Sequence, residues 1–439
     1  MHRLYEPAAY DPPAHRFWAR TAPPDWPRLE GDERTEVAVI GGGFTGVSAA
    51  LHLAETGVEA MLLEAETAGF GASGRNGGFC CLGGAKASDA RLRSRFGQEG
   101  LQDWHRTERA AVETVANLLT RHGIDADTHS AGETQLAHTP RAMRALRAAV
   151  PDLQRAYGVT PEVIEPEDLK AAGLGGPFHG AVTIPIGFAL DPARYHAGLS
   201  RAAAAAGAAL HGQSAVRRIR PDGARWRLET GHGTVSAKRV ILATNGYGAE
   251  DVPDWLRGRT LPVLSNVIVT RPLSAAERDA QGWTSRQMAY DTRQLLHYFR
   301  LLPDDRFLFG MRGGLSATPR ETRATARRIR RDFQAMFPAW RGVEITHDWS
   351  GLACLTSTLT PFVGPVPDMP GVFAGFGYHG NGVAMGTYAG TLLAAQAGDR
   401  PMPGPYPDAI RTPPPRFPLG RFRRALLRPA YIAAEALDL

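Results

Sequence analysis

A spaced set of glycines followed by an acid is the feature of this chain that bears most directly on chemistry. Gly41, Gly43 and Gly46 have the spacing G-x-G-x-x-G directly after a short apolar strand, Val37 to Ile40. Such glycines permit a tight turn, let a pyrophosphate approach the backbone, and let the following helix lie close to the strand. Glu64 ends a second apolar strand 18 residues after the last glycine, where an acid can accept hydrogen bonds from a ribose. The pattern predicts a dinucleotide-binding unit and therefore a redox enzyme.

Two further glycine segments favour FAD over NAD. The loop after Glu64 is almost all small residues from 69 to 78, so it offers many backbone N–H groups to an extended cofactor; the alternative is a flexible surface loop. Gly375, Gly377 and Gly380 repeat the G-x-G-x-x-G spacing before a small-residue helix. Because no strand ending in an acid follows, we interpret this turn as a helix N-terminus directed at the flavin, where its dipole stabilises the negative charge of the reduced form.

The elements that must position these residues alternate between helices and strands. Helical periodicity and capping residues predict helices over 99–122, 140–157, 192–207, 320–337 and 384–397. Strands are expected over 214–220, 225–230, 233–237, 240–243, 262–271, 294–312 and 372–374. The mixture predicts an α/β (α+β mixed) fold, in which a Rossmann-like FAD-binding domain is interleaved with an antiparallel-sheet substrate domain.

The same pattern predicts that both domains are discontinuous. We expect the FAD-binding domain to comprise residues 36–88, 188–255 and 345–400, and the substrate domain to comprise residues 89–187 and 256–344. Residues 1–35 are expected to form a Pro-rich arm, and residues 401–439 a Pro-rich and basic extension.

Composition excludes several other functions. The chain has 439 residues and a net charge of +6, but its basic residues are scattered, which argues against nucleic-acid binding. Its three cysteines form no CxxC motif, so we expect no metal site and no disulfide framework. No segment approaches a membrane-spanning length and no signal peptide is evident, so a cytoplasmic protein is expected. The basic C-terminal helix can contact an anionic membrane, but packing against the protein body is the favoured interpretation.

Seven motifs, in order along residues 16–398, resemble the D-amino-acid-oxidase superfamily of FAD-dependent amine and amino-acid oxidoreductases. The chain is most similar to its gamma-glutamylputrescine oxidoreductase branch. The motifs are FWARTAPP, VAVIGGGFTGVSAALHLAETG, GASGRNGGF, ILATNGY, HYFRLLPDDRFLFGMRGG, WSGLACLTSTLTPFVG and GFGYHGNGVAMGTYAGTLLA. The chain departs from the common pattern at Thr358 to Thr360, where an acid or arginine is frequent, and at His379 and Asn381. These departures concern the substrate rather than the fold.

The resemblance implies a set of residues that hold FAD, with the segment from Gly377 to Val383 at the isoalloxazine and the strand end at Thr244 near the adenine. The expected set is Gly41, Gly43, Phe44, Thr45, Gly46, Glu64, Ala65, Gly71, Ala72, Ser73, Arg75, Asn76, Gly77, Gly78, Val216, Thr244, Asn245, Gly246, Gly377, Gly380, Asn381, Gly382 and Val383.

The resemblance also implies oxidation of a C–N bond by hydride transfer to flavin N5, giving an imine that hydrolyses. The expected partners are a small amine or amino acid and either oxygen or another electron acceptor. The alternatives are a dehydrogenase that passes electrons to a quinone or a partner protein, and a flavin-binding protein without turnover. Some relatives use a lysine near the flavin to speed oxygen reduction, but none of Lys86, Lys170 and Lys238 falls in a motif expected to face it.

The candidate catalytic residues are His379, Tyr378, His297, Tyr298 and Arg300. His379 can act as a base near neutral pH or merely position the flavin. Alternation along a strand places only one of His297 and Tyr298 in the cavity. Arg300 shares the face of Tyr298 and can bind a substrate carboxylate, although a structural ion pair is an equal alternative.

A covalent flavin link through a cysteine occurs in some relatives. Cys354 lies in the corresponding broad region, but we interpret it as a small buried hydrophobic residue. Cys80 and Cys81 are likewise expected to be buried in packing.

Overall fold

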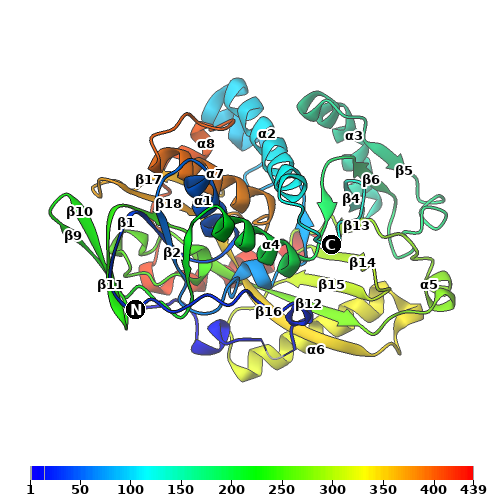
Figure 1. The fold of residues 1–439 in the computed structure, drawn as a ribbon. Coiled ribbons are helices and arrows are strands. Elements are labelled where there is room, and N and C mark those ends of the chain that lie inside the picture. Colours follow the sequence, from blue (N-terminus) through cyan, green and yellow to red (C-terminus); the bar gives the residue numbers. More distant parts are fainter. Residues whose placement is uncertain (1, 14, 439) are drawn as a thin grey trace.

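Two eight-stranded sheets organise the computed structural model, which describes residues 2–13 and 15–438 (Figure 1). The first sheet contains β1 (Gly31–Ile40), β2 (Ala60–Leu63), β8 (Ala209–His211), β9 (Arg218–Asp222), β10 (Arg225–Glu229), β11 (Gly233–Leu242), β17 (Phe362–Pro365) and β18 (Val372–Phe376). The second contains β4 (Glu133–Leu136), β5 (Glu162–Ile164), β6 (Ala181–Ile184), β12 (Leu261–Thr270), β13 (Met288–Asp291), β14 (His297–Leu301), β15 (Phe307–Arg312) and β16 (Ile345–Leu355). The short strands β3 (Phe79–Cys80) and β7 (Phe188–Ala189) pair with each other.

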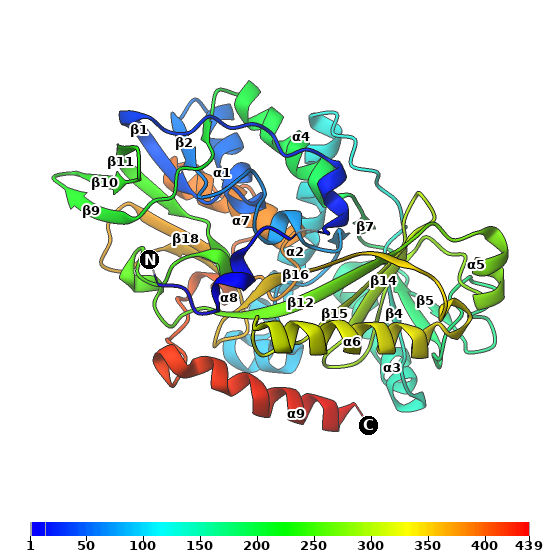
Figure 2. The same cartoon turned by 90° about the horizontal axis from the view of Figure 1, so that it is seen from below.

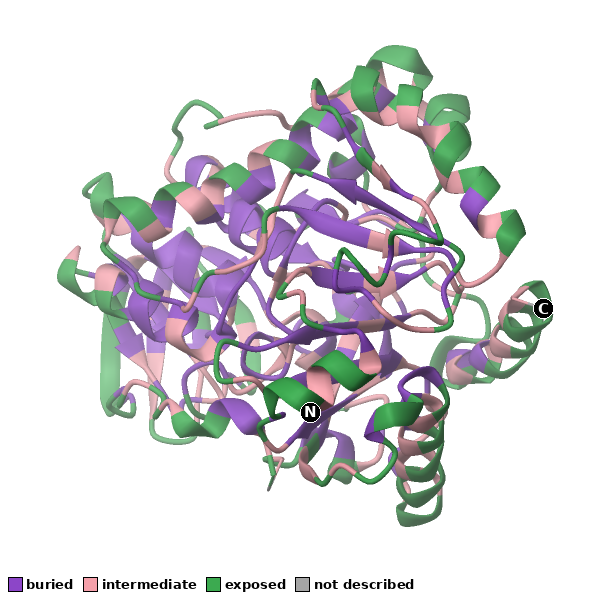
Figure 3. Cartoon of the chain, turned by 90° about the vertical axis from the view of Figure 1, so that its right-hand side faces the viewer, coloured by how far each residue is buried: buried purple, intermediate pink, exposed green. Residues whose placement is uncertain are grey.

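The helices described by the structure cover these sheets. They are α1 (Phe44–Glu55), α2 (Asp89–Arg121), α3 (Pro140–Tyr157), α4 (Pro192–Ala205), α5 (Ala275–Gln281), α6 (Pro319–Met336), α7 (Ala384–Ala397), α8 (Asp408–Arg411) and α9 (Leu427–Leu437). Buried residues concentrate in the strands and on the inner helix faces, whereas the outer faces are exposed (Figure 3). The mixed α/β fold expected from the sequence is confirmed.

β1 lies at the centre of the first sheet because its apolar residues are buried on both faces. It pairs in parallel with β11 on one side and with β2 on the other. Val37 and Val39 pack with α1 and α7 in one hydrophobic cluster, and Ala38 and Ile40 pack in another on the opposite face. A parallel strand covered on both faces reads as a continuous apolar run, which is why this strand is recognisable in the sequence.

The second sheet separates an aromatic core from a cavity. On one face, Phe299, Phe307 and Phe309 pack against α6 and Trp340, and Figure 2 shows α6 lying along this sheet. On the other face, Tyr298 projects from β14 into a cavity shared with the first sheet. The alternation of side chains along β14 therefore assigns the two faces different roles.

The helix and strand predictions are largely confirmed, with some differences at their ends. α3 has the expected bounds, and Asp191 caps α4 by accepting the N–H groups of Ala193 and Arg194. α2 begins at Asp89, ten residues before its expected start at 99, and continues through a kink at Gly97, where φ is 76°. The segments expected at 233–237 and 240–243 form one strand, β11.

Three expected domain limits differ from the packing. β1 begins at Gly31, inside the segment expected to be an arm, because residues 31–35 pair with the start of β11. β16 begins at Ile345 but pairs antiparallel with β12, so it lies in the second sheet rather than in the FAD-binding unit. α2 was assigned to the substrate domain, yet its buried face, including Leu101 and Trp104, belongs to the cluster that contains α1 and α7.

The C-terminal extension is anchored to the body of the protein. Arg423 is fully buried and donates to the carbonyl of Thr260 and to the carboxylate of Glu250. Arg328 of α6 forms a 2.8 Å ion pair with Glu435 of α9, which lies beyond α6 in Figure 2. Among residues 2–13 and 15–438, no helix is both long and apolar enough to cross a membrane.

Candidate functional site

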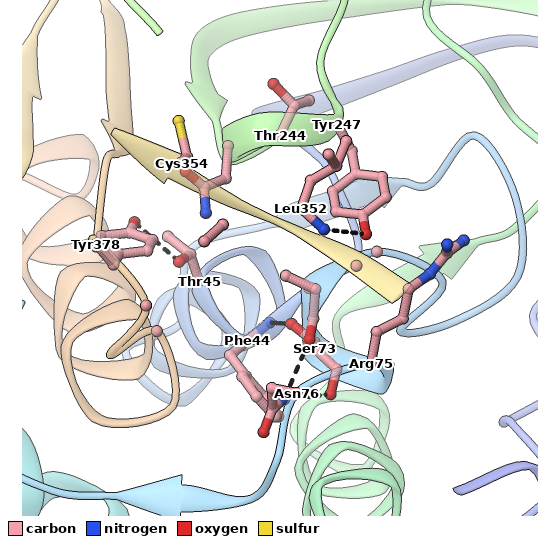
Figure 4. Close-up of a pocket in the computed structure, with 18 of the residues that line it drawn as sticks. Phe44, Thr45, Ser73, Arg75, Asn76, Thr244, Tyr247, Leu352, Cys354 and Tyr378 are labelled. Carbon is pink, nitrogen blue, oxygen red and sulfur yellow. Dashed lines mark hydrogen bonds between the residues drawn. The ribbon is translucent and has the colours of Figure 1, made fainter. Parts of the chain in front are cut away.

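A cavity of about 380 Å³ lies between the two sheets and brings both glycine turns together. Its walls include the early turn after β1, the small-residue loop after β2, the end of β11, part of β16 and the late turn before α7. Figure 4 shows Thr45 of the early turn beside Tyr378 of the late turn, with Ser73 of the loop and Cys354 of β16 around the same pocket. Segments separated by more than 300 residues in sequence therefore line one site.

The early turn is shaped by close backbone approaches. Gly41 has φ of 110°, and a Cβ there would lie 2.7 Å from the carbonyl oxygen of Ala243. A Cβ on Gly43 would lie 2.9 Å from the hydroxyl of Ser73, which accepts the N–H of Phe44 at 2.9 Å. A side chain at either glycine would fill this cradle, so the backbone stays accessible to a phosphate at the start of α1.

Glu64 lies where the sequence predicts it, directly after β2 and on the cavity wall. Its carboxylate oxygens accept the N–H of Gly42 at 2.6 Å and the N–H of Glu66 at 3.0 Å. Burial raises the pKa of Glu64, while these backbone bonds oppose the shift. The carboxylate is thus fixed by the turn that it adjoins, with its remaining lone pairs available to a ligand in the cavity.

The late turn is tied to the early one by Tyr378. The hydroxyl of Thr45, in the first turn of α1, donates to the hydroxyl of Tyr378 at 2.9 Å. The N–H of Gly377 donates to the side-chain oxygen of Asn245 at 3.0 Å, which joins the end of β11 to the same turn. One extended ligand can therefore contact the early turn, the end of β11 and the late turn together.

Most of the residues expected to hold the cofactor line this cavity, including Ala65, Gly71, Ala72, Arg75, Asn76, Gly77, Val216, Thr244, Gly380, Asn381, Gly382 and Val383. Gly46, Gly78, Gly246 and Gly377 are not on its wall and act one layer behind it. A Cβ on Gly46 would lie 1.9 Å from the carbonyl oxygen of Gly41, and one on Gly78 would lie 2.0 Å from that of Leu190. These glycines allow close packing of the segments that form the wall.

His379 reaches the cavity wall, but its ring is held by backbone groups on both nitrogens. Nδ1 lies 2.8 Å from the carbonyl oxygen of Gly84, and Nε2 accepts the N–H of Thr356 at 3.2 Å. Burial, with the charges of Lys86 and Arg312, lowers the pKa of His379 to about 3, so the ring is neutral. Because neither nitrogen has a free lone pair, the geometry favours the positioning role over that of a base.

Two other candidates are placed away from the cavity. His297 lies on the aromatic face of β14, 2.9 Å from Asp291 and 3.5 Å from Asp332. Arg300 is fully buried and donates to the carbonyl oxygens of Gly77 at 3.0 Å and Leu190 at 2.7 Å. Its guanidinium supports the loop beneath the cavity instead of facing a substrate. Of the two neighbours on β14, it is Tyr298 that lines the cavity, as alternation allows.

Several polar residues on the cavity wall were not predicted from the sequence, among them Tyr290, Arg312 and Lys86. Tyr290 lies opposite Tyr298 in the β13–β14 pair, and Arg312 lies two residues after Gly310, which pairs with Tyr298. Alternation along β15 would have placed Arg312 on this face once the strand pairing was known. Lys86 also lines the cavity, so the expectation that no lysine faces this site is wrong. Lys86 lies in an irregular segment, where no helix or strand periodicity indicates which way a side chain points.

Lys86 and Arg312 give this end of the cavity its positive charge. Neither forms an ion pair with an acid among the described residues. Lys86 is exposed overall, and part of its side chain borders the cavity. The charge of Arg312, together with burial, lowers the pKa of Lys86 to about 7. An anionic ligand group would stabilise both cations here.

The three cysteines are free and buried. Cys354 lines the cavity, and burial raises the pKa of its thiol to about 12, so it is not a thiolate at neutral pH. Cys81 also reaches the cavity, where the side-chain amide of Asn381 lies 3.3 Å from its sulfur. Within the described residues, no cluster of His, Cys, Asp and Glu is suited to a metal ion.

The residues present fit a dinucleotide. The cradle at Gly41 and Gly43 excludes side chains, and Glu64 borders it. One buried guanidinium nitrogen of Arg75, Nη2, has no hydrogen-bond partner among the described residues. An unpaired buried donor on a cavity wall is costly unless a ligand accepts it.

Comparisons with known proteins agree with this geometry. A family described as FAD dependent oxidoreductase matches residues 36–396. Probable oxidoreductase OrdL of Rhizobium meliloti is 32% identical over 94% of this chain and 95% of its own length. Gamma-glutamylputrescine oxidoreductase of Escherichia coli is 29% identical over 82% of each chain.

Solved structures show the same fold. Glycine oxidase from Geobacillus kaustophilus aligns with a TM-score of 0.70 at 21% identity, over 87% of this chain and 99% of that one. Iminodiacetate oxidase from Chelativorans aligns with a TM-score of 0.68 at 19% identity, over 87% of this chain and 100% of that one.

Proposed function

Because the chain belongs to the DAO family of FAD-dependent oxidoreductases, we propose that it oxidises the C–N bond of an amine or amino acid that carries a carboxylate. The observation that supports this most directly is the charge at one end of the cavity. Lys86 and Arg312 line the wall, and neither is paired with an acid among the described residues. A substrate carboxylate would supply the missing anion, and Arg312 would bind it through two parallel hydrogen bonds.

Relatives support the same substrate class. One is named for gamma-glutamylputrescine, and others are named for glycine, proline and iminodiacetate. Each of these compounds contains an amine or secondary amine nitrogen next to a C–H bond, and each contains a carboxyl group. In this proposal the carboxylate contact is made by Arg312 of β15, which lines the cavity, instead of by Arg300 of β14.

Bound FAD supplies the hydride acceptor, and the residues of the chain bind and orient the reactants. The cradle around Gly41, Gly43 and Glu64 would hold the nucleotide end of the cofactor, and the turn from Tyr378 to Val383 would border its ring system. Tyr298 forms part of the substrate wall, with its hydroxyl 3.0 Å from that of Ser265. The polar groups of this wall argue for turnover rather than for a flavin-binding protein without a substrate site.

An anaerobic screen tests the proposal. The FAD-loaded protein is mixed with primary and secondary amines, each with and without a carboxyl group, while flavin absorbance is followed. Bleaching by carboxylate-bearing amines is expected. In the Arg312→Leu variant the KM for these compounds should rise about 100-fold, and that for uncharged amines should change little, because only the former lose a charged hydrogen bond. Failure of every amine and amino acid to bleach the flavin would end the proposal.

The cations at the cavity wall also bear on the electron acceptor. Positive charge stabilises the anion formed when oxygen takes up an electron, so we propose that oxygen can serve as the acceptor. Lys86→Met should then slow peroxide formation more than it slows reduction of an uncharged dye. Slow peroxide formation and fast dye reduction by the unaltered protein would instead indicate a dehydrogenase that uses a quinone or a partner protein.

A further inference from the structure

A buried carboxyl lies directly behind one tyrosine of the substrate wall. The hydroxyl of Tyr290 donates to Oε2 of Glu133 at 2.9 Å. Tyr290 is half-buried and lines the cavity, whereas Glu133 is 2% exposed and does not line it. The phenolic oxygen therefore connects the cavity to an acid that no substrate can contact.

Several segments around Glu133 contribute groups that bear on its charge. Tyr290 of β13, the thiol of Cys81 and the backbone N–H of Leu82 form hydrogen bonds with it, and Glu108 of α2 acts on it electrostatically. Burial raises the pKa of Cys80 and of Tyr157 on α3, and the charge of Glu133 adds to both shifts. None of these groups is a cation. The carboxyl of Glu133 therefore forms hydrogen bonds but has no ion-pair partner among the described residues.

The chemistry proposed above requires such a group. An amine is an ammonium ion in neutral solution, and it must lose a proton before hydride can leave the neighbouring carbon. His379 cannot accept that proton, because Gly84 and Thr356 occupy both of its nitrogens. Arg312 is a cation suited to the carboxylate end of a substrate, and Lys86, whose pKa its charge lowers to about 7, lines the same end of the cavity. Tyr290 is the remaining residue of the wall that couples the cavity to a buried acid.

Resting on the proposed amine oxidation, we propose that Tyr290 and Glu133 form a proton relay that deprotonates the substrate ammonium. The N–H bond of the ammonium breaks as its proton passes to the phenolic oxygen of Tyr290. The phenolic proton passes at the same time to Oε2 of Glu133, where a new O–H bond forms. Tyr290 is neutral before and after, the amine leaves the step neutral, and Glu133 ends protonated.

Tyr290 is the catalytic residue of this pair, because it contacts the substrate nitrogen. Glu133 acts through Tyr290 and is a positioning residue that also stores the proton. Burial is the main cause that raises the pKa of Glu133 to about 8, which lies close to the pH at which a base works best in neutral solution. Glu133 is therefore ionised and able to accept the proton above that pH, and it is progressively protonated and unable to do so below it.

The pH dependence of anaerobic flavin reduction tests the relay in the FAD-loaded protein, with an amine that bleaches the flavin in the screen. In the unaltered protein the rate should rise with pH and level off above about 8, the pKa of Glu133. In Glu133→Gln the rate at neutral pH should fall about 100-fold and keep rising toward the substrate's own ammonium pKa. The two profiles should converge there, since a neutral amine needs no base. Tyr290→Phe should give the same profile as Glu133→Gln.

Glu108→Gln is the matched control. Glu108 is also a buried acid bonded to a tyrosine, at 2.7 Å from the hydroxyl of Tyr157, but neither residue lines the cavity. This variant should keep a rate that rises with pH to a plateau, with the plateau reached at slightly lower pH, because the charge of Glu108 is one of the causes that raise the pKa of Glu133. A loss of rate in Glu133→Gln that is equal at all pH values would show a merely structural role and overturn the relay. A Glu133→Gln variant whose rate still levels off near pH 8, the pKa of Glu133, would also overturn the relay.

An infrared titration separates failure of the relay from failure of the proposed function, because it needs no substrate. The FAD-loaded protein should lose two protonated-carboxyl bands as the pH rises, with pKa values of about 7 for Glu108 and about 8 for Glu133. Glu108→Gln should remove the first band and Glu133→Gln the second. If Glu133→Gln removes neither band, Glu133 does not titrate near pH 8 and cannot give the flavin-reduction rate its pH dependence, which overturns the relay whatever amine is oxidised.

Discussion

Arg300 and Arg312 show how one position in a sheet decides the role of a side chain. Both lie on strands of the second sheet, and within the part of the chain that the structure describes neither forms an ion pair with an acid. The guanidinium of Arg300 donates hydrogen bonds to the carbonyl oxygens of Gly77 and Leu190. Arg312 faces the cavity beside Lys86. The first is therefore a support of the loop, and the second a candidate for substrate contact.

The effect of Arg312 on Lys86 should be measurable as a change in the reactivity of the lysine. The charge of Arg312 is the main cause that lowers the pKa of Lys86 to about 7, so about half of this lysine is neutral and nucleophilic at neutral pH. Arg312→Leu removes the charge, and the pKa of Lys86 should rise, which lowers its neutral fraction at neutral pH by about tenfold per pKa unit. Labelling with an amine-selective reagent, followed by peptide mass spectrometry, measures the change.

Lys238 is the internal reference for this experiment. It is an exposed lysine paired with Glu36 and distant in sequence from both cavity cations. Its labelling should be the same in the unaltered protein and in Arg312→Leu. Equal labelling of Lys86 in the two proteins would contradict the proposed coupling between the two cations.

The residues expected to bind the cofactor through backbone geometry were predictable from the sequence, whereas Tyr290 and Arg312 of the substrate wall were not. The glycine spacing around Gly41 and the position of Glu64 depend on contacts within a single strand–turn–helix–strand unit. Tyr290 and Arg312 reach the cavity only through the register of strands β13, β14 and β15. That register depends on long-range pairing, which local periodicity does not contain.

At the scale of elements, the contact between β1 and α1 depends on Gly46. A Cβ at this position would lie 1.9 Å from the carbonyl oxygen of Gly41, so Gly46→Ala must push α1 away from the strand. We expect a loss of about 1–3 kcal/mol in the free energy of unfolding, together with weaker FAD binding because the cradle moves. Urea denaturation and flavin retention on gel filtration measure the two effects.

Gly342 offers a control for the same substitution. It is exposed, and a Cβ there meets no atom within 4 Å, so Gly342→Ala should change the free energy of unfolding by less than about 0.5 kcal/mol. Similar stabilities for Gly46→Ala and Gly342→Ala would show that α1 can move without cost, which contradicts the geometry described for the turn.

The loop between β2 and β3 is held by Arg300 of β14. Arg300→Met would leave the buried carbonyl oxygens of Gly77 and Leu190 without their donors, at a cost of about 2–4 kcal/mol in the free energy of unfolding. Arg300→Lys should recover only part of this, because a single ammonium cannot reproduce the fork of donors. Arg323→Met, on the exposed face of α6, is the neutral reference. Full recovery by lysine would argue against the two-carbonyl support.

Helix existence was predictable because helices are specified locally, whereas membership of a domain was not. Thr139 caps α3 and Asp191 caps α4 through their side chains, which accept N–H groups of the first turn. The assignment of β16 was missed because it depends on pairing with β12, and that of α2 was missed because it depends on packing against α7. An amphipathic helix shows that one of its faces is buried, but not which partner buries it.

At the scale of the whole molecule, the cavity is the place where the two sheets meet. Its wall combines the early turn, the late turn and the Tyr290–Tyr298–Arg312 face of the second sheet. Tyr378 and Asn245 already join the first two of these regions by hydrogen bonds. A cofactor that fills the cavity would add contacts between segments that are otherwise linked by few groups.

Binding of FAD should therefore raise the stability of the chain as a whole and not only that of the first sheet. A ligand that binds only the folded state adds RT ln(1 + [L]/Kd), which is about 4 kcal/mol when free FAD is 1,000 times its Kd. Thermal unfolding of flavin-free protein should shift upward as FAD is added, with signals from both sheets shifting together because both form the cavity. NAD at the same concentration is the matched control and should cause little shift, since the late glycine turn is interpreted as a flavin contact. A midpoint that does not depend on FAD, or that shifts equally with NAD, would contradict the assignment of this cavity to a flavin dinucleotide.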